Sequence, residues 1–249
     1  MINIHQKFCK ETFYSGSLIN FEPIYEESFN FAYDVIDAIA SVTPDKRAMV
    51  WCNDKGEEHT FTFSDISKYS NMAANMFLSL GVKRGDKVML VLKRHYQFWF
   101  AVLGLHKIGA IAVPAVNQLT KKDFLYRFKT AKIQALVCTV DGDVIDHAEE
   151  AISEYNGLKF IMSVNGKRKG WKCFDEDIKE YSKQLNRHET KCTDPMLLYF
   201  TSGTTGMPKM VCHDFTYPLG HIVTAKYWQN VIPDGLHLTI SDTGWLKSM

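Results

Sequence analysis

Residues 87–116 read KVMLVLKRHYQFWFAVLGLHKIGAIAVPAV and set the architecture of the whole chain. The apolar run at 87–92 predicts a buried strand. Residues 96–105 are apolar on nearly every side, which predicts a helix inside a large domain. Residues 110–113 repeat the strand pattern. A strand, a helix and a second strand in this order predict a right-handed crossover between parallel strands.

The same alternation continues after this stretch. The apolar periodicity predicts further helices at 121–131 and 144–155 and further strands at 135–140, 158–164 and 196–200. A polar stretch at 165–194 is expected to run over the surface. We therefore expect an α/β fold, a doubly wound and mostly parallel sheet with helices on both faces.

Upstream of residue 87 the pattern predicts a helix at 31–39 and a hairpin of strands 48–52 and 59–63. A second helix is expected to begin at the N-cap Ser64 and to end at Gly81. Residues 1–28 are expected to form an N-terminal extension to the folded region at 29–249.

Composition excludes several classes of protein. The chain has 249 residues, 46% of them hydrophobic, which fits an ordinary globular protein with a sizeable core. A formal net charge of +1 provides no broad positive field for nucleic acid or an anionic membrane. No charge-free stretch reaches the roughly 20 apolar residues of a membrane span, so none is expected. The N-terminus does not resemble a secretory signal.

The six cysteines lie far apart and include no C-x-x-C pair. This spacing favours reduced thiols over a metal site or a disulfide framework, so no metal site is predicted. Together with the absence of a secretory signal, it leads us to expect a cytoplasmic protein.

The segment at 196–213, MLLYFTSGTTGMPKMVCH, carries the chemistry. Glycines let backbone N–H groups turn toward an anion, hydroxyls add donors without negative charge, and a lysine supplies a positive charge. A strand that leads into such a loop places it at the carboxyl edge of the sheet, where open α/β sheets bind ligands. The predicted phosphate-binding residues are Thr201, Ser202, Gly203, Thr204, Thr205, Gly206 and Lys209.

The alternative is a surface turn rich in Ser, Thr and Gly, which composition alone favours. The ordered arrangement of hydroxyls, glycines, proline and lysine argues against it. The loop is also not the usual nucleotide P-loop, because Pro208 precedes the lysine and Met210 stands where Ser or Thr would bind magnesium. An ordinary P-loop NTPase is therefore disfavoured.

The string TSGTTGMPK at 201–209 resembles the phosphate-binding signature of the acyl-adenylate-forming (AMP-binding) superfamily. The resemblance extends from about Phe29 to the end of the chain. Met210-Val211 after the lysine, and the run SDTGW at 241–245, resemble acetyl-CoA and medium-chain acyl-CoA synthetases. The fold expected from this resemblance is the first subdomain of the large domain of an adenylate-forming enzyme.

The resemblance implies a two-step ligase that uses ATP, Mg and coenzyme A. A short- or medium-chain carboxylic acid would form acyl-AMP and then the acyl-CoA thioester. Trp245, Leu246 and His213 are candidate substrate-pocket residues under this reading. A packing histidine and a buried aromatic at a strand end are the alternatives. Asp242 could contact magnesium or cap a turn.

Members of the superfamily are about twice as long as this chain or longer. The motifs for adenine and ribose, and the small C-terminal domain with its lysine, are absent here. We therefore expect an N-terminal fragment of an acyl-CoA synthetase that is inactive on its own. Its cut edge is expected to allow self-association. The alternative is a noncatalytic module that binds nucleotide or phosphate, or that a partner chain completes.

Overall fold

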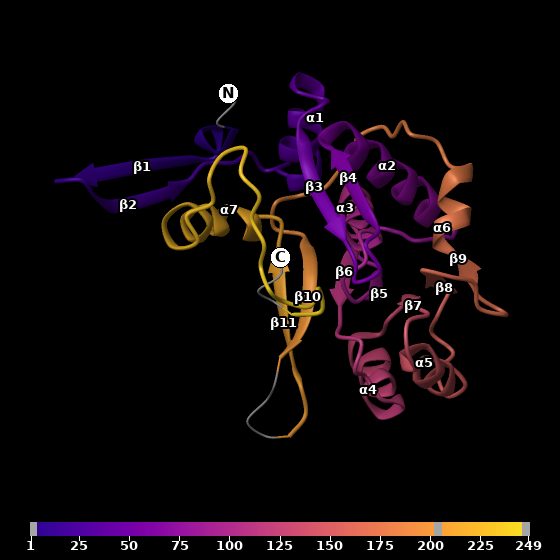
Figure 1. Ribbon diagram of the computed structural model, residues 1–249. Helices are drawn as coiled ribbons and strands as arrows, with labels where there is room; N and C mark the ends of the chain where they lie inside the picture. The colour runs from indigo at the N-terminus through magenta and orange to yellow at the C-terminus, as the bar shows by residue number, and fades with distance from the viewer. Residues whose placement is uncertain (1–3, 202–205, 246–249) are drawn as a thin grey trace.

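The computed structural model describes residues 4–201 and 206–245. Within these ranges the centre of the molecule is a seven-stranded sheet in the order β11-β10-β6-β5-β7-β8-β9 (Figure 1). Every neighbouring pair is parallel except β10 and β11. The strands are β5 (Lys87–Val91), β6 (Ile111–Pro114), β7 (Ala135–Thr139), β8 (Phe160–Val164), β9 (Lys172–Cys173), β10 (Pro195–Thr201) and β11 (Lys209–Asp214). The mostly parallel sheet is confirmed.

Helices cover both faces of the sheet, as predicted. One core cluster joins α2 (Phe63–Ser79) and α3 (Gln97–Lys107) to one face, and a second joins α4 (Lys121–Ala131) and α5 (Val144–Ile152) to the other. The chain passes from β5 to β6 through α3, and then crosses back through α4 to β7 on the other side of β5. The fold is therefore doubly wound, with its switch point between β5 and β7.

Helices α2 and α3 pack closely because Gly104 has no side chain. A Cβ at this position would lie 2.9 Å from both the Ala73 Cβ and the Ala74 backbone nitrogen. At the end of α3, the buried Lys107 ammonium donates to Asp37 at 2.8 Å and to Asn71 at 2.7 Å. These contacts tie α3 to α2 and to the helical segment η2 (Ala32–Asp37), which continues into α1 (Ala38–Val42).

The start of α2 differs from the prediction. Thr62, the last residue of β4 (Glu58–Thr62), is the N-cap, and its hydroxyl accepts from the Asp65 backbone N–H at 3.1 Å. The Asp65 carboxylate in turn accepts from the Thr62 N–H at 2.9 Å. Ser64 was wrong as the cap because this reciprocal pair satisfies the end of the helix two residues earlier. The hairpin itself, β3 (Arg47–Cys52) with β4, is confirmed.

Two regions contain more structure than the sequence predicted. The expected extension holds a 3₁₀ turn, η1 (Ile4–Lys7), and a hairpin of β1 (Cys9–Tyr14) and β2 (Ser17–Pro23) that projects from the sheet (Figure 1). The surface stretch at 165–194 includes β9, α6 (Phe174–Asp177) and the 3₁₀ turn η3 (Ile178–Glu180). After β11 come α7 (Tyr217–Val223) and η4 (Thr224–Trp228).

Candidate phosphate-binding site

The predicted phosphate loop connects β10 to β11, an antiparallel pair whose last register position is Thr201 opposite Lys209. The chain therefore leaves the loop as a strand and not as the first turn of a helix. Binding of an anion must instead rely on the loop's amides and hydroxyls and on Lys209. Ser202, Gly203, Thr204 and Thr205 lie outside the described residues, so their predicted role stays a prediction.

Gly206 and Lys209 are both exposed at the described end of the loop. Gly206 has φ = +94°, a backbone conformation that glycine adopts readily, and no atom of the described residues would lie within 4 Å of a Cβ there. The backbone angle, and not lack of space, therefore favours glycine. Among the described residues, no carboxylate forms an ion pair with Lys209. Its ammonium can meet an external anion.

The hairpin extends beyond the carboxyl edge of the sheet, as the sequence predicted. β10 runs parallel to β6, so its C-terminal end at Thr201 lies at the same edge as the ends of β5 and β6. Figure 1 shows the two strands continuing past the sheet toward the side of α4. This is the edge at which open α/β sheets bind ligands.

The switch point at the same edge is filled by the protein's own side chains. The buried His95 ring, just after β5, has Nε2 3.0 Å from the Thr139 hydroxyl and 3.1 Å from the Asp141 carboxylate. Burial lowers the pKa of His95, while the charge of Asp141 acts in the opposite direction. Since these groups satisfy one another, the hairpin is the more accessible ligand site at this edge.

His213 lies at the other end of β11 from Lys209. It pairs with Leu197 in the register and stands four residues from Lys209, which is about 13 Å along a strand. Its ring packs on Tyr217 with centroids 4.0 Å apart, and its Nε2 is buried with no hydrogen-bond partner among the described residues. Burial lowers the pKa of His213. These contacts are those expected of a packing histidine, the alternative to a substrate-pocket role for His213.

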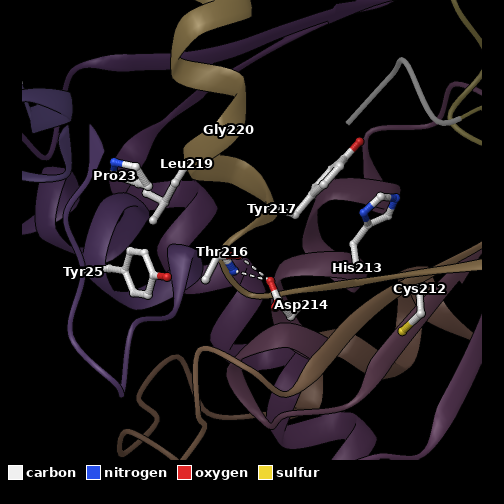
Figure 2. A pocket seen from close by; sticks show the side chains of 9 residues that line it. All are labelled: Pro23, Tyr25, Cys212, His213, Asp214, Thr216, Tyr217, Leu219 and Gly220. Atoms are coloured by element: carbon white, nitrogen blue, oxygen red, sulfur yellow. Dashed lines mark hydrogen bonds between the residues drawn. The ribbon is translucent and has the colours of Figure 1, made fainter. Parts of the chain in front are cut away.

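His213 also borders a cavity of about 450 Å³, a volume within the range of small-molecule sites. Figure 2 shows its ring and that of Tyr217 on one side of Asp214 and Thr216, with Tyr25 on the other. Neither Lys209 nor Trp245 borders this cavity. The lining residues are Pro23, Tyr25, Cys212, His213, Asp214, Thr216, Tyr217, Leu219 and Gly220.

The segment at 242–245 crosses the carboxyl ends of β5 and β6. The Thr243 hydroxyl donates to the Lys93 carbonyl, and a Cβ on Gly244 would lie 2.2 Å from the backbone between Ala115 and Val116. Asp242 accepts from the Gly244 N–H at 2.8 Å, so it caps this turn, one of the two roles considered for it. Trp245, 57% exposed, thus shares the edge with the hairpin. Leu246 lies outside the described residues.

Known proteins match this chain along most of its length. The model of the family described as AMP-binding enzyme matches residues 36–243. The chain belongs to this family. The match to AMP-binding enzymes confirms the resemblance drawn from TSGTTGMPK.

Acyl-coenzyme A synthetases are among the relatives of this AMP-binding enzyme chain. ACSM5 of Homo sapiens is 35% identical over 231 residues, and ACSM3 of Homo sapiens is 35% identical over 232 residues. Each alignment covers 89% of this chain and 39% of the relative. The chain therefore spans about two fifths of the length of the curated relatives it matches.

A crystal structure of the anthranilate CoA ligase AuaEII in complex with anthranoyl-AMP superposes with a TM-score of 0.71. It is 23% identical in sequence, and the match covers 84% of this chain and 39% of that chain. At this identity the likeness supports the fold alone.

The expected cytoplasmic location is wrong. The acyl-coenzyme A synthetases ACSM5, ACSM4 and ACSM3 are mitochondrial proteins by name. All six cysteines are free, and free thiols fit any reducing compartment, so they never distinguished the cytoplasm from the mitochondrion. No helix in the described part of the chain has both the length and the apolarity to cross a membrane.

Proposed function

We propose that this chain supplies the phosphate-binding part of an ATP-dependent, AMP-forming acyl-CoA synthetase. The observation that carries the proposal is Lys209, an exposed lysine at the end of a hairpin on the carboxyl edge of the sheet, with no ion-pair partner in the described part of the chain. Membership of the AMP-binding enzymes and the names of the relatives support it.

In the proposed first step, a substrate carboxylate oxygen attacks the α-phosphorus of ATP. The bond to the bridging oxygen breaks, and pyrophosphate leaves with acyl-AMP as the product. In the second step the thiol of coenzyme A attacks the acyl carbon, AMP leaves, and the thiol proton passes to solvent or a base. Both steps bring anions together, so positioning and charge neutralisation supply most of the catalysis.

Lys209 would neutralise the departing pyrophosphate. The hydroxyls of Thr201, Ser202, Thr204 and Thr205 and the amides of Gly203 and Gly206 would complete the cradle. The part of the chain that the structure describes contains no group of three or more His, Cys, Asp or Glu side chains that could hold a metal ion. We propose that Mg²⁺ would enter the site with the phosphates of ATP.

We propose a short- or medium-chain acid as the substrate, with its acyl group near Trp245 and Leu246. Support comes from Gly244, whose close approach to the backbone at Ala115 holds Trp245 at the same edge as the hairpin. His213 is a weaker candidate for this role, because it borders a separate cavity.

The proposal is tested by titrating ATP and inorganic pyrophosphate into the 249-residue chain by calorimetry. Saturable binding is expected in the wild type, and Lys209→Ala should weaken it at least about tenfold because a charge-assisted contact is lost. Lys55→Ala is the matched control, since Lys55 is an exposed lysine in the turn of another hairpin. Unchanged binding by Lys209→Ala would contradict the assignment.

A second candidate function is a module that a partner chain completes. The segment at 228–240 favours it, because large apolar side chains are exposed there and such patches mark interaction surfaces. The most exposed are Trp228, Ile232, Leu236, Leu238 and Ile240. Release of pyrophosphate from ATP and a carboxylate, with and without coenzyme A, separates the two functions. Sedimentation at several concentrations tests the predicted self-association.

A further inference from the structure

Within the described sheet, the β10–β11 hairpin pairs with another strand on one side only. β11 is the edge strand of the sheet, and the last rung of the hairpin, Thr201 with Lys209, lies past the end of β6. A two-stranded ribbon is only marginally stable alone. The position of Lys209 therefore depends on whatever else holds the base of the hairpin.

Two neighbouring side chains of α4 hold this base. The Tyr126 hydroxyl donates to the Pro208 carbonyl at 2.9 Å, and the Tyr126 ring meets the Phe200 ring edge-on with centroids 6.0 Å apart. The Arg127 guanidinium lies over the same Phe200 ring, 5.1 Å from its centroid. One helix thus contacts the hairpin at Phe200 in β10 and at Pro208 just before β11, each one residue from the Thr201–Lys209 rung.

Arg127 is itself fixed in place. It is buried, its Nη1 donates to the Asp123 carbonyl at 3.1 Å, and burial lowers the pKa of its guanidinium. Asp123 also accepts from the Thr120 N–H at 3.0 Å at the start of α4. The contact with Phe200 therefore comes from a side chain that is buried and hydrogen-bonded within α4.

We propose that Tyr126 is a positioning residue for the phosphate site, and that its hydroxyl sets the direction in which the hairpin leaves the sheet and so the place of Lys209. This inference rests on the proposed function. A loop site is less well defined than one on a helix or strand, so an anchor on α4 lowers the cost of ordering the loop around an anion.

The test compares Tyr126→Phe with Tyr155→Phe. Both changes remove one hydroxyl, and that of Tyr155 also donates to a backbone carbonyl, Ile133, at 2.9 Å, but away from the hairpin. For Tyr126→Phe we expect a three- to tenfold weaker affinity for inorganic pyrophosphate, roughly the value of one neutral hydrogen bond. Amide hydrogen exchange in the peptide at 206–212 should become faster by about the same factor. Tyr155→Phe should change neither quantity.

A double variant shows whether the hydroxyl acts through the lysine. If it does, Tyr126→Phe should weaken pyrophosphate binding much less when Lys209→Ala is already present, and equal effects in both backgrounds would contradict the inference. Unchanged exchange at 206–212 in Tyr126→Phe overturns the inference, as does faster exchange with unchanged affinity. Absence of pyrophosphate binding by the wild type overturns the proposed function instead, and the exchange measurement still decides whether Tyr126 anchors the hairpin.

Discussion

The α2–α3 layer and the β10–β11 hairpin differ in how deeply their charged residues are buried and in whether those charges are paired. In the layer, Gly104, His106 and Lys107 are buried, and the Lys107 charge is paired inside the protein. In the hairpin, Gly206 and Lys209 are exposed, and Lys209 has no described ion-pair partner. A buried charge needs its internal partner to stay paired, whereas an exposed charge can bind a ligand. Substitutions in the layer should therefore change the free energy of unfolding far more than those in the hairpin.

The largest effect is expected from Gly104→Val. Its Cβ alone would lie 2.9 Å from the backbone of α2, which cannot move aside as a side chain could. We expect a loss of about 4 kcal/mol or more in the free energy of unfolding, measured by urea denaturation. The control is Gly220→Val in α7, where a Cβ would have nothing within 4 Å. Equal losses in the two variants would show that close packing of α2 and α3 is not the cause.

The next largest effect is expected from Asp37→Ala. It leaves the Lys107 ammonium buried without its carboxylate, and burial already lowers the pKa of Lys107. We expect the free energy of unfolding to fall by about 3 kcal/mol. This is the lower end of the range for breaking a buried ion pair, because the Asp37 side chain is 26% exposed. Combining Asp37→Ala with Lys107→Met should recover part of the loss in the same denaturation assay. No recovery would mean that the unpaired charge is not the main cost.

His106 predicts a dependence of stability on pH. Burial lowers its pKa to about 4 from 6.5, although a hydrogen bond with the Met196 backbone acts in the opposite direction. Between these values the unfolded chain binds a proton that the folded chain does not, so stability is greatest above pH 6.5 and falls as pH drops toward 4. We expect His106 to account for a loss of about 2 kcal/mol between pH 7 and 5.

Denaturation of His106→Gln at both pH values measures this contribution. The variant should lose less stability than the wild type on acidification, because glutamine does not titrate. If the free energy of unfolding of the wild type and the variant depended on pH in the same way, His106 would not be a cause of the acid sensitivity.

The smallest effect on stability is expected from Lys209→Ala. The lysine is exposed and forms no ion pair with residues 4–201 or 206–245, so its loss should change the free energy of unfolding by less than about 0.5 kcal/mol. The same variant should lose most of its affinity for pyrophosphate. Measuring both quantities on one preparation sharpens the contrast with the α2–α3 layer, and a large loss of stability would mean that Lys209 supports the hairpin itself.

Much of the fold could be predicted because it follows from local periodicity. The helix at 121–131 has the predicted ends, and the strand–helix–strand pattern around Tyr96 is that of β5, α3 and β6. The cap of α2 was misplaced because Thr62 and Ser64 are both good caps, and only the reciprocal bond with Asp65 distinguishes them. The projecting hairpin of β1 and β2 was not predicted, because its two strands are short and largely exposed and carry little apolar alternation.

The sequence by itself was enough to predict the family, since the loop at 201–209 has hydroxyls, glycines and a lysine in the order of the family's signature, and the same order predicts an anion site. Only the tertiary structure decided which residues surround it. The pairing of Lys209 with Thr201 separates His213 from the site, the turn at Gly244 brings Trp245 to the same edge, and Tyr126 reaches Pro208 across 82 positions of sequence. Local patterns specify strands and helices, whereas contacts between distant segments depend on how those elements pack.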